Sequence, residues 1–176
     1  MAKHRILVPL DGSDFSRQIL PYVREFLSAA DNELVLLRVG SRPAVNTSPP
    51  PHPVGPEMGL PAVAWGAEMQ LAAPTTDTGQ ALDSVQATML DELQADAMSL
   101  HHTGYTVSTF AEFGDPAHAI VEFVEREHIN LVAMTTHGRS GLGRLIAGSV
   151  AEAVVRHISV PVLLLHPREH ASQPGA

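Results

Sequence analysis

The chain has 176 residues, of which 44% are hydrophobic, and a formal charge of −8. This composition suits one globular domain and argues against nucleic acid or an anionic membrane as the main partner, because both require a basic face. The absence of cysteine excludes disulfides and thiolate metal sites. The apolar residues before Asp11 are too few for a secretory leader and no later run could span a membrane, so we expect a cytoplasmic protein.

The first elements follow the pattern strand, helix, strand. Arg5–Leu10 is a compact β-rich run that ends at the turn Asp11-Gly12-Ser13. Apolar residues then recur at helical spacing from Phe15 to Leu27, with Ser13 as the expected N-cap. Glu33–Val39 is continuously apolar, as expected for a strand that helices cover on both sides. This order implies parallel pairing of the two strands.

Residues 40–79 differ in character, since they hold eight of the fourteen prolines and lack periodicity. We interpret them as an insertion, either a flap over a neighbouring site or a mobile linker, and the composition favours the linker. Residues 81–100 carry an apolar helical stripe. Tyr105–Ala111 is the expected third strand, and Asp115 is the expected N-cap of a helix that begins at Pro116.

Residues 131–157 predict a strand, a glycine loop and a helix. Asn130–Met134 is the fourth strand, and a loop with three glycines leads into a helix from Ser149 to about His157. Such a junction leaves main-chain N–H groups unpaired, which favours phosphate as a ligand, although a surface turn explains the local pattern equally well. Val160–Leu165 is the fifth strand, so that residues 1–168 form a single domain with a polar tail at 169–176.

The expected fold class is α/β, an open five-stranded parallel sheet with helices on both faces and the Rossmann-like strand order 3-2-1-4-5. Ligands bind such sheets at the carboxyl ends of the strands, where the winding reverses. There, Pro9–Asp11 and Met134–Thr136 flank one crevice, and this placement favours the phosphate interpretation of the glycine loop.

Two common nucleotide motifs are excluded. A Walker-type loop needs a lysine after its last glycine, and the only lysine here is Lys3, before the first strand. The dinucleotide fingerprint belongs after the first strand, where this chain has Asp11-Gly12-Ser13-Asp14 instead.

The residues Ile6–Ser13, Met134–Gly138, Gly148–Val150 and Pro161–Leu164 together resemble the universal stress protein family, in its nucleotide-binding branch. The loop of that family has a glycine, nine further residues and then glycine with serine or threonine, and Gly138 and Gly148-Ser149 match this spacing. Thr135 stands where the family has a first glycine. A threonine adds a Cβ there, but its hydroxyl can donate a hydrogen bond.

The resemblance implies a site for ATP, with Mg or Mn carried by the phosphates. The residues themselves show no evident catalytic acid–base pair and no convincing metal-ligand spacing, so we expect no catalytic residue and no protein metal ligand. The resemblance places an acceptor for base or ribose at Asp11 and an adenine-reading main chain at Val39. Met134 and Thr135 would lie nearby. The implied site residues are Pro9, Asp11, Val39, Met134 and Thr135 around the nucleoside, and His137, Gly138, Arg139, Gly148, Ser149 and Val150 around the phosphates. From the residues alone, Asp11 is equally a turn cap, and His137 is equally a solvated loop residue.

The expected function is therefore an adenine-nucleotide-binding stress-response or signalling module with little or no hydrolysis. One alternative is a slow ATPase or phosphotransferase with His137 as its only local base, and another is a dimerisation module that binds no nucleotide. A homodimer through Val162–Leu165 is expected if this strand is outermost. The competing expectation is a monomer in which the tail or the insertion covers that edge.

Overall fold

The computed structural model describes residues 3–42, 78–136 and 148–167. They form a five-stranded parallel sheet in the order β3-β2-β1-β4-β5, which confirms the predicted fold class and strand order. The strands are β1 (His4–Pro9), β2 (Asn32–Gly40), β3 (Thr106–Phe113), β4 (Leu131–Thr135) and β5 (Val162–Leu165). Most of the insertion predicted at 40–79 and all of the tail at 169–176 lie outside the described residues, so this division of the chain stays a prediction.

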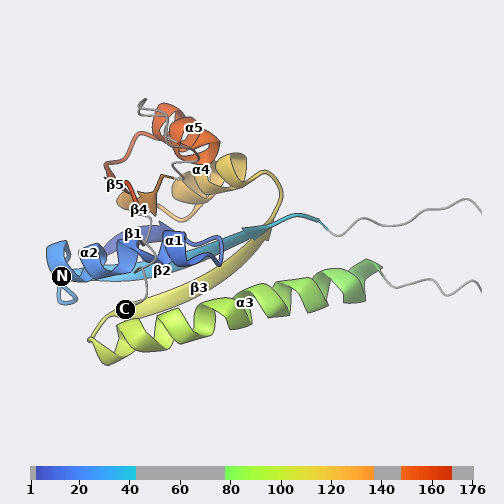
Figure 1. Cartoon of the computed structure of the whole chain (residues 1–176), viewed down its shortest axis with the longest axis horizontal. Coiled ribbons are helices and arrows are strands. Elements are labelled where there is room, and N and C mark those ends of the chain that lie inside the picture. Colours follow the sequence, from blue (N-terminus) through green and yellow to red (C-terminus); the bar gives the residue numbers. More distant parts are fainter. Residues whose placement is uncertain (1–2, 43–77, 137–147, 168–176) are drawn as a thin grey trace, which may run out of the picture.

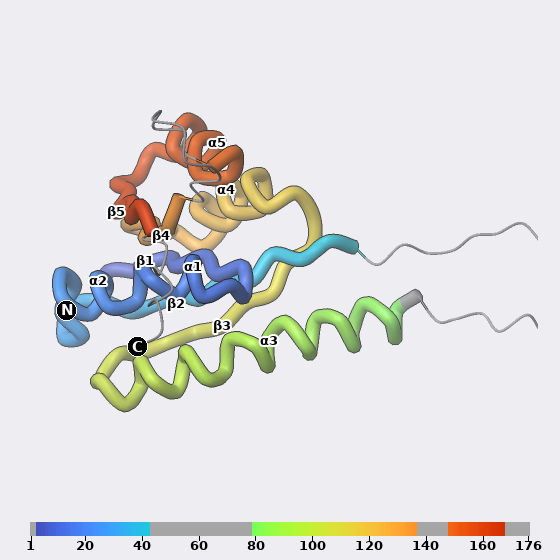
Figure 2. The backbone as a smooth tube through the Cα atoms, in the orientation of Figure 1, coloured from blue at the N-terminus to red at the C-terminus, as the bar shows by residue number. Residues whose placement is uncertain are grey.

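Helices cover both faces of the sheet, as Figure 1 shows. The helices α1 (Asp14–Arg17), α2 (Ile19–Phe26) and α3 (Thr78–His102) lie on one side, and α4 (Pro116–Arg126) and α5 (Ser149–His157) lie on the other. In the tube view of Figure 2, β4 and β5 continue the sheet on the side of β1 that faces away from β3. This arrangement makes β3 and β5 the two edge strands.

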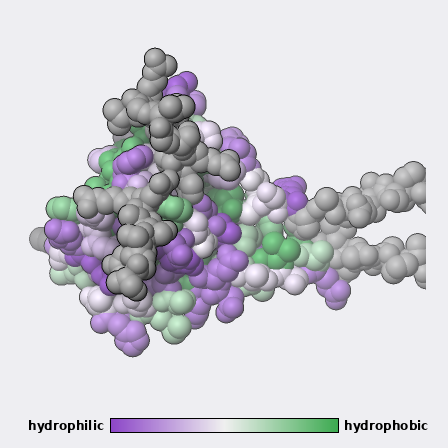
Figure 3. Space-filling view, in the orientation of Figure 1, coloured by the Kyte–Doolittle hydropathy of each residue, from purple (hydrophilic) through white to green (hydrophobic). Residues whose placement is uncertain are grey.

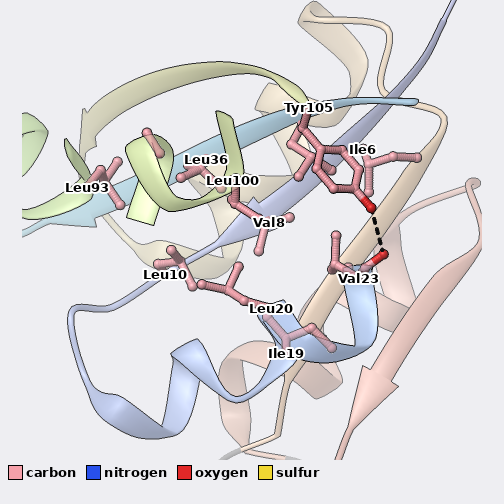
Figure 4. Packing of buried hydrophobic residues seen from close by; sticks show 13 residues of the cluster. Ile6, Val8, Leu10, Ile19, Leu20, Val23, Leu36, Leu93, Leu100 and Tyr105 are labelled. Carbon is pink, nitrogen blue, oxygen red and sulfur yellow. Dashed lines mark hydrogen bonds between the residues drawn. The ribbon is translucent and has the colours of Figure 1, made fainter. Parts of the chain in front are cut away.

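The alternation of side chains along the strands divides the core into two clusters. Ile6 and Val8 of β1 pack with α2 and α3, whereas Leu7 between them packs with α4 and α5. Figure 4 shows the first cluster, in which the hydroxyl of Tyr105 donates a hydrogen bond to the carbonyl oxygen of Val23 at 3.4 Å. Because both faces of the sheet are covered, the central strands carry uninterrupted apolar runs, Ile6–Val8 in β1 and Leu34–Leu37 in β2.

The single helix predicted from Phe15 to Leu27 is wrong in one respect, because the structure divides it at Gln18 into α1 and α2. Pro21 explains the break: a proline has no N–H to donate to the carbonyl of Arg17 four residues earlier, and its ring clashes with that carbonyl. The helix restarts so that Pro21 falls in the first turn of α2. The predicted cap at Ser13 is confirmed, since its hydroxyl accepts from the N–H of Ser16 at 3.1 Å.

Helix α4 has well-defined caps at both ends. Asp115 is its N-cap, as predicted, and accepts from the N–H of His118 at 3.0 Å. At the other end, His128 has φ +51°, and the N–H of Ile129 donates to the carbonyl of Val124 at 3.0 Å. This is the Schellman pattern, in which the left-handed position usually belongs to glycine.

Helix α3 is less buried along its first turns than along the rest of its length. Met89 and Leu93 are buried, whereas Leu82 and Val85 are only half-buried. Figure 3 shows hydrophobic surface at this end of the molecule, next to the grey segments. The fifth strand also begins two residues later than predicted, at Val162.

Candidate functional site

The strands β1 and β4 separate before β1 ends. Their pairing covers only Ile6 with Leu131 and Leu7 with Val132. Main-chain groups of the odd-numbered residues of β1 face β4, since the N–H of Asn130 donates to the carbonyl of Arg5 at 2.9 Å. Pro9 is the next odd-numbered residue after Leu7 and has no N–H. The missing donor ends the ladder at this point and lets the strands diverge.

A cleft of about 510 Å³ lies where the strands diverge, at the carboxyl ends of β1, β2 and β4. The first turns of α4 and α5 close it from the other side. Its lining is Pro9, Leu10, Asp11, Ser16, Leu37, Val39, Pro116, Ile120, Met134, Thr135, Gly148, Ser149, Val150 and Ala151. The buried side chains of Leu37, Ile120 and Met134 give the cleft an apolar wall, which suits a flat hydrophobic group.

Two strands present main-chain polar groups to the cleft. The ladder between β1 and β2 ends at Pro9–Leu37, and the N–H of Leu10 donates to the carbonyl of Leu37 at 2.9 Å. Val39 lies two residues further and turns its N–H and C=O to the same side, beyond the end of β1. On β4, the N–H of Thr136 donates to Leu165 of β5 at 2.8 Å, so the main chain of Thr135 faces the opposite way, toward the cleft.

The turn after β1 brings a carboxylate to the cleft. Asp11 Oδ1 accepts from the N–H of Ser13 at 2.9 Å and from its hydroxyl at 2.6 Å. Gly12, between them, has φ +83°, a conformation that favours glycine. Asp11 therefore caps the turn, as one interpretation of the sequence expects, and it also lines the cleft, while its contact with a ligand stays a prediction.

The two helix N-termini at the cleft differ. At α4, the carboxylate of Asp115 accepts from one of the N-terminal N–H groups, that of His118. At α5, the N-cap is Gly148, which has no side chain to accept from the first turn. The N–H groups of the first turn of a helix have no acceptor within the helix, and they favour an anion. Of the two helix ends, the start of α5 is therefore the one whose cap residue leaves its first-turn N–H groups to another acceptor.

The structure brings eight of the eleven predicted site residues into this one cleft: Pro9, Asp11, Val39, Met134, Thr135, Gly148, Ser149 and Val150. The other three, His137, Gly138 and Arg139, lie outside the described residues. Sequence reasoning missed Ser16, Leu37, Pro116 and Ile120. The signal for Pro116 was available, because a helix that begins after the third strand of this topology starts at the same edge of the sheet.

Comparison with known families supports the interpretation of the fold. The model of the universal stress protein family matches residues 3–166. This chain belongs to the universal stress protein family. Universal stress protein MJ0531 of Methanocaldococcus jannaschii is 31% identical to it over 163 residues, which are 92% of this chain and 81% of that protein.

Solved structures of universal stress proteins share the fold. One, a universal stress protein in complex with cAMP, matches with a TM-score of 0.53 and 19% identity, over 96% of this chain and 100% of the other. Another, a family protein from Arabidopsis thaliana with AMP bound, matches with a TM-score of 0.55 and 13% identity, over 97% of both chains.

Three further findings on this universal stress protein concern one contact beside the cleft and the described residues as a whole. The hydroxyl of Thr136 lies 3.1 Å from Nδ1 of His166, which ties the end of β4 to the residue after β5. Among residues 3–42, 78–136 and 148–167, no three histidine or carboxylate side chains gather in a way that could hold a metal. In the same ranges, the helices are too short or too polar to cross a membrane.

Proposed function

We propose that this universal stress protein binds an adenine nucleotide, ATP in the first place, in the cleft between β1 and β4. The observation that carries the proposal is the polarity of the cleft along its length. One end offers an apolar wall beside the main chain of Val39, and the other offers the start of α5, whose cap residue Gly148 has no side chain. A nucleotide has the matching order, a flat base at one end and phosphates at the other.

The nucleoside would lie between Pro9, Val39 and Met134. The edge of adenine carries one donor and one acceptor side by side, and the N–H and C=O of Val39 can pair with both. Asp11 would accept from the ribose or the base. Two solved universal stress proteins of the same fold hold cAMP and AMP, and this class of ligand is what we propose for the present chain.

The phosphates would lie at the start of α5. The N–H groups of Ser149 and Val150, the hydroxyl of Ser149 and the positive end of the helix dipole favour an anion there. His137, Gly138 and Arg139 would complete this end. Mg or Mn would be carried by the phosphates, and within residues 3–42, 78–136 and 148–167 no cluster of three ligands competes for it.

We expect hydrolysis to be slow. Efficient phosphoryl-transfer sites add a lysine clamp and a positioned base to the metal ion, and the only lysine here, Lys3, instead donates to the carbonyl of Ala29 at 3.0 Å. Asp11 is engaged by Ser13. A turnover below about 1 per second with ATP and Mg is the expected result, and a faster rate would favour the alternative of an ATPase or phosphotransferase with His137 as base.

Calorimetry tests the binding proposal. The wild type should bind ATP and, more weakly, adenosine. Gly148→Val places a branched side chain where the main chain would approach phosphate, so ATP affinity should fall while adenosine affinity stays. Wild-type protein without affinity for either ligand would overturn the proposal and would favour the module that binds no nucleotide.

We also propose a homodimer through β5. This strand is an outermost strand, and Leu164 on it is 42% exposed. Pairing with a second copy would satisfy its outer main-chain groups and cover Leu164. Sedimentation should detect a dimer at micromolar concentration, and Leu164→Lys should split it. A wild-type protein that is monomeric, including after removal of residues 168–176, would contradict this interface.

A further inference from the structure

The turn that carries Asp11 is held from α3 through an arginine. Arg17 donates from Nη1 to the carbonyl of Gly12 at 2.7 Å and from Nε to Asp96 Oδ2 at 2.9 Å. Asp96 lies on α3, and its side chain is only 15% exposed. The hydrogen bond to Asp96 raises the pKa of Arg17. One side chain thus joins the main chain of the cleft turn to a helix 79 residues further along the chain.

A second arginine approaches the same turn from β2. Arg38 donates from Nε to Glu92 Oε2 at 3.1 Å. Its guanidinium packs closely against Gly12, since a Cβ at Gly12 would lie 3.1 Å from Arg38 Nη2. Glu92 and Asp96 are four residues apart and share one face of α3. Two carboxylates of one helix therefore hold two arginines that lie against one glycine.

This arrangement fixes the direction of Asp11. The position of its carboxylate depends on the conformation of the Asp11–Ser13 turn, which needs the positive φ of Gly12. The carbonyl of Gly12 can rotate only if it leaves Arg17, and the turn can move toward β2 only if Arg38 moves away. Small displacements at a binding group reduce affinity considerably when the ligand needs a defined geometry.

We propose that Arg17 and Arg38 are positioning residues for the cleft, and that they couple the placement of α3 to nucleotide affinity. The coupling rests on the function proposed above. By linkage, a ligand that needs the turn in its present conformation also stabilises the docked position of α3. Any partner that shifts α3 lowers the affinity for the nucleotide by the same factor by which the nucleotide lowers the affinity for that partner.

The competing explanation is that the two ion pairs only attach α3 to the sheet. The helix has other means of attachment, since four of its own side chains are buried: Met89, Leu93, Ala97 and Leu100. Partly exposed ion pairs add little to stability. A purely structural role would therefore change the free energy of unfolding slightly and leave the cleft unaffected.

The experiment combines three variants with two measurements. Arg17→Met keeps the aliphatic stem and removes both hydrogen bonds, and Asp96→Asn weakens the anchor on α3. The matched control is Glu127→Gln, which affects a comparable ion pair at the amino end of β1, far from the cleft. There, Arg5 Nη1 lies 3.3 Å from Glu127 Oε2. Calorimetry gives the affinity for ATP, and hydrogen exchange of the Ser13 amide reports on the turn without any ligand.

Arg17→Met should lower the affinity for ATP about fivefold or more, the lower end of ordinary coupling between sites, and Asp96→Asn should have a smaller effect of the same sign. Arg17→Met and Asp96→Asn should both accelerate exchange of the Ser13 amide. Glu127→Gln should change neither this exchange nor the affinity for ATP. ATP should in turn slow exchange in α3 of the wild type. If Arg17→Met alters only the free energy of unfolding, the positioning role is wrong. If the wild type binds no ATP, the proposed function fails, and the exchange of the Ser13 amide still decides whether Arg17 holds the turn.

Discussion

A negative charge at the start of α5 should strengthen the fold and weaken ATP binding. Ser149 is the first residue of α5 and lines the cleft, and its N-cap Gly148 offers no side-chain acceptor. In Ser149→Asp, the carboxylate meets the positive end of the helix, which is worth about 0.3–1 kcal/mol of stability. The same carboxylate would lie roughly 5 Å from the phosphates, where one pair of like charges costs about 3 kcal/mol at an effective dielectric constant of about 20.

This repulsion corresponds to a loss of roughly 100-fold in ATP affinity. Ser149→Asn is the matched control, because it has the same shape without the charge, and we expect it to lose less than about tenfold. Calorimetry measures the affinities for ATP and for adenosine, and urea denaturation measures the free energy of unfolding. Adenosine should bind both variants as it binds the wild type. Undiminished binding of ATP to Ser149→Asp, or an equal loss for ATP and adenosine, would refute the placement of phosphates at α5.

Three other predictions concern the fold. Phe123 is fully buried and meets Phe110 edge to face at 5.2 Å, so Phe123→Ala should cost about 3–5 kcal/mol in urea denaturation, and a loss below about 1 kcal/mol would contradict this packing. His128 has φ +51°, so His128→Gly should stabilise the protein by about 0.5–1 kcal/mol, whereas a lower midpoint would show that the imidazole has a role of its own. Burial raises the pKa of Tyr105, so the unfolded chain releases this proton first and stability should fall as the pH rises above about 10. Tyr105→Phe should reduce this fall in stability. If thermal melts of the variant lose stability with rising pH as steeply as those of the wild type, Tyr105 is not the responsible group.

Local chemistry explains which parts of the fold could be predicted from the sequence. Ser13 and Asp115 cap helices through bonds to residues three positions away, so a short window of sequence contains the whole interaction. The break at Gln18 was equally local, but the apolar stripe continues through it and conceals the effect of Pro21. The ends of elements are thus predictable where one residue decides them and uncertain where two signals compete.

The cleft itself depends on topology. Asp11 and Met134 could be placed together because the strand order brings the ends of β1 and β4 to one edge. Ile120 enters the cleft from a helix whose rotation about its axis depends on packing with the sheet, and no local spacing determines that. The pairing of Arg17 with Asp96 has no periodic signature either, because it joins residues 79 positions apart.

The early end of the β1–β4 ladder has a consequence for the energetics of recognition. The gap between these strands depends on a hydrogen bond that Pro9 cannot make, and no bulky side chain has to hold the strands apart. Pro9 acts in the same way whether or not the cleft is occupied, so the nucleotide proposed for the cleft would spend no binding free energy on separating β1 from β4. For this part of the site, the apparent affinity should equal the intrinsic one, without the reduction that a sparsely populated open state would impose.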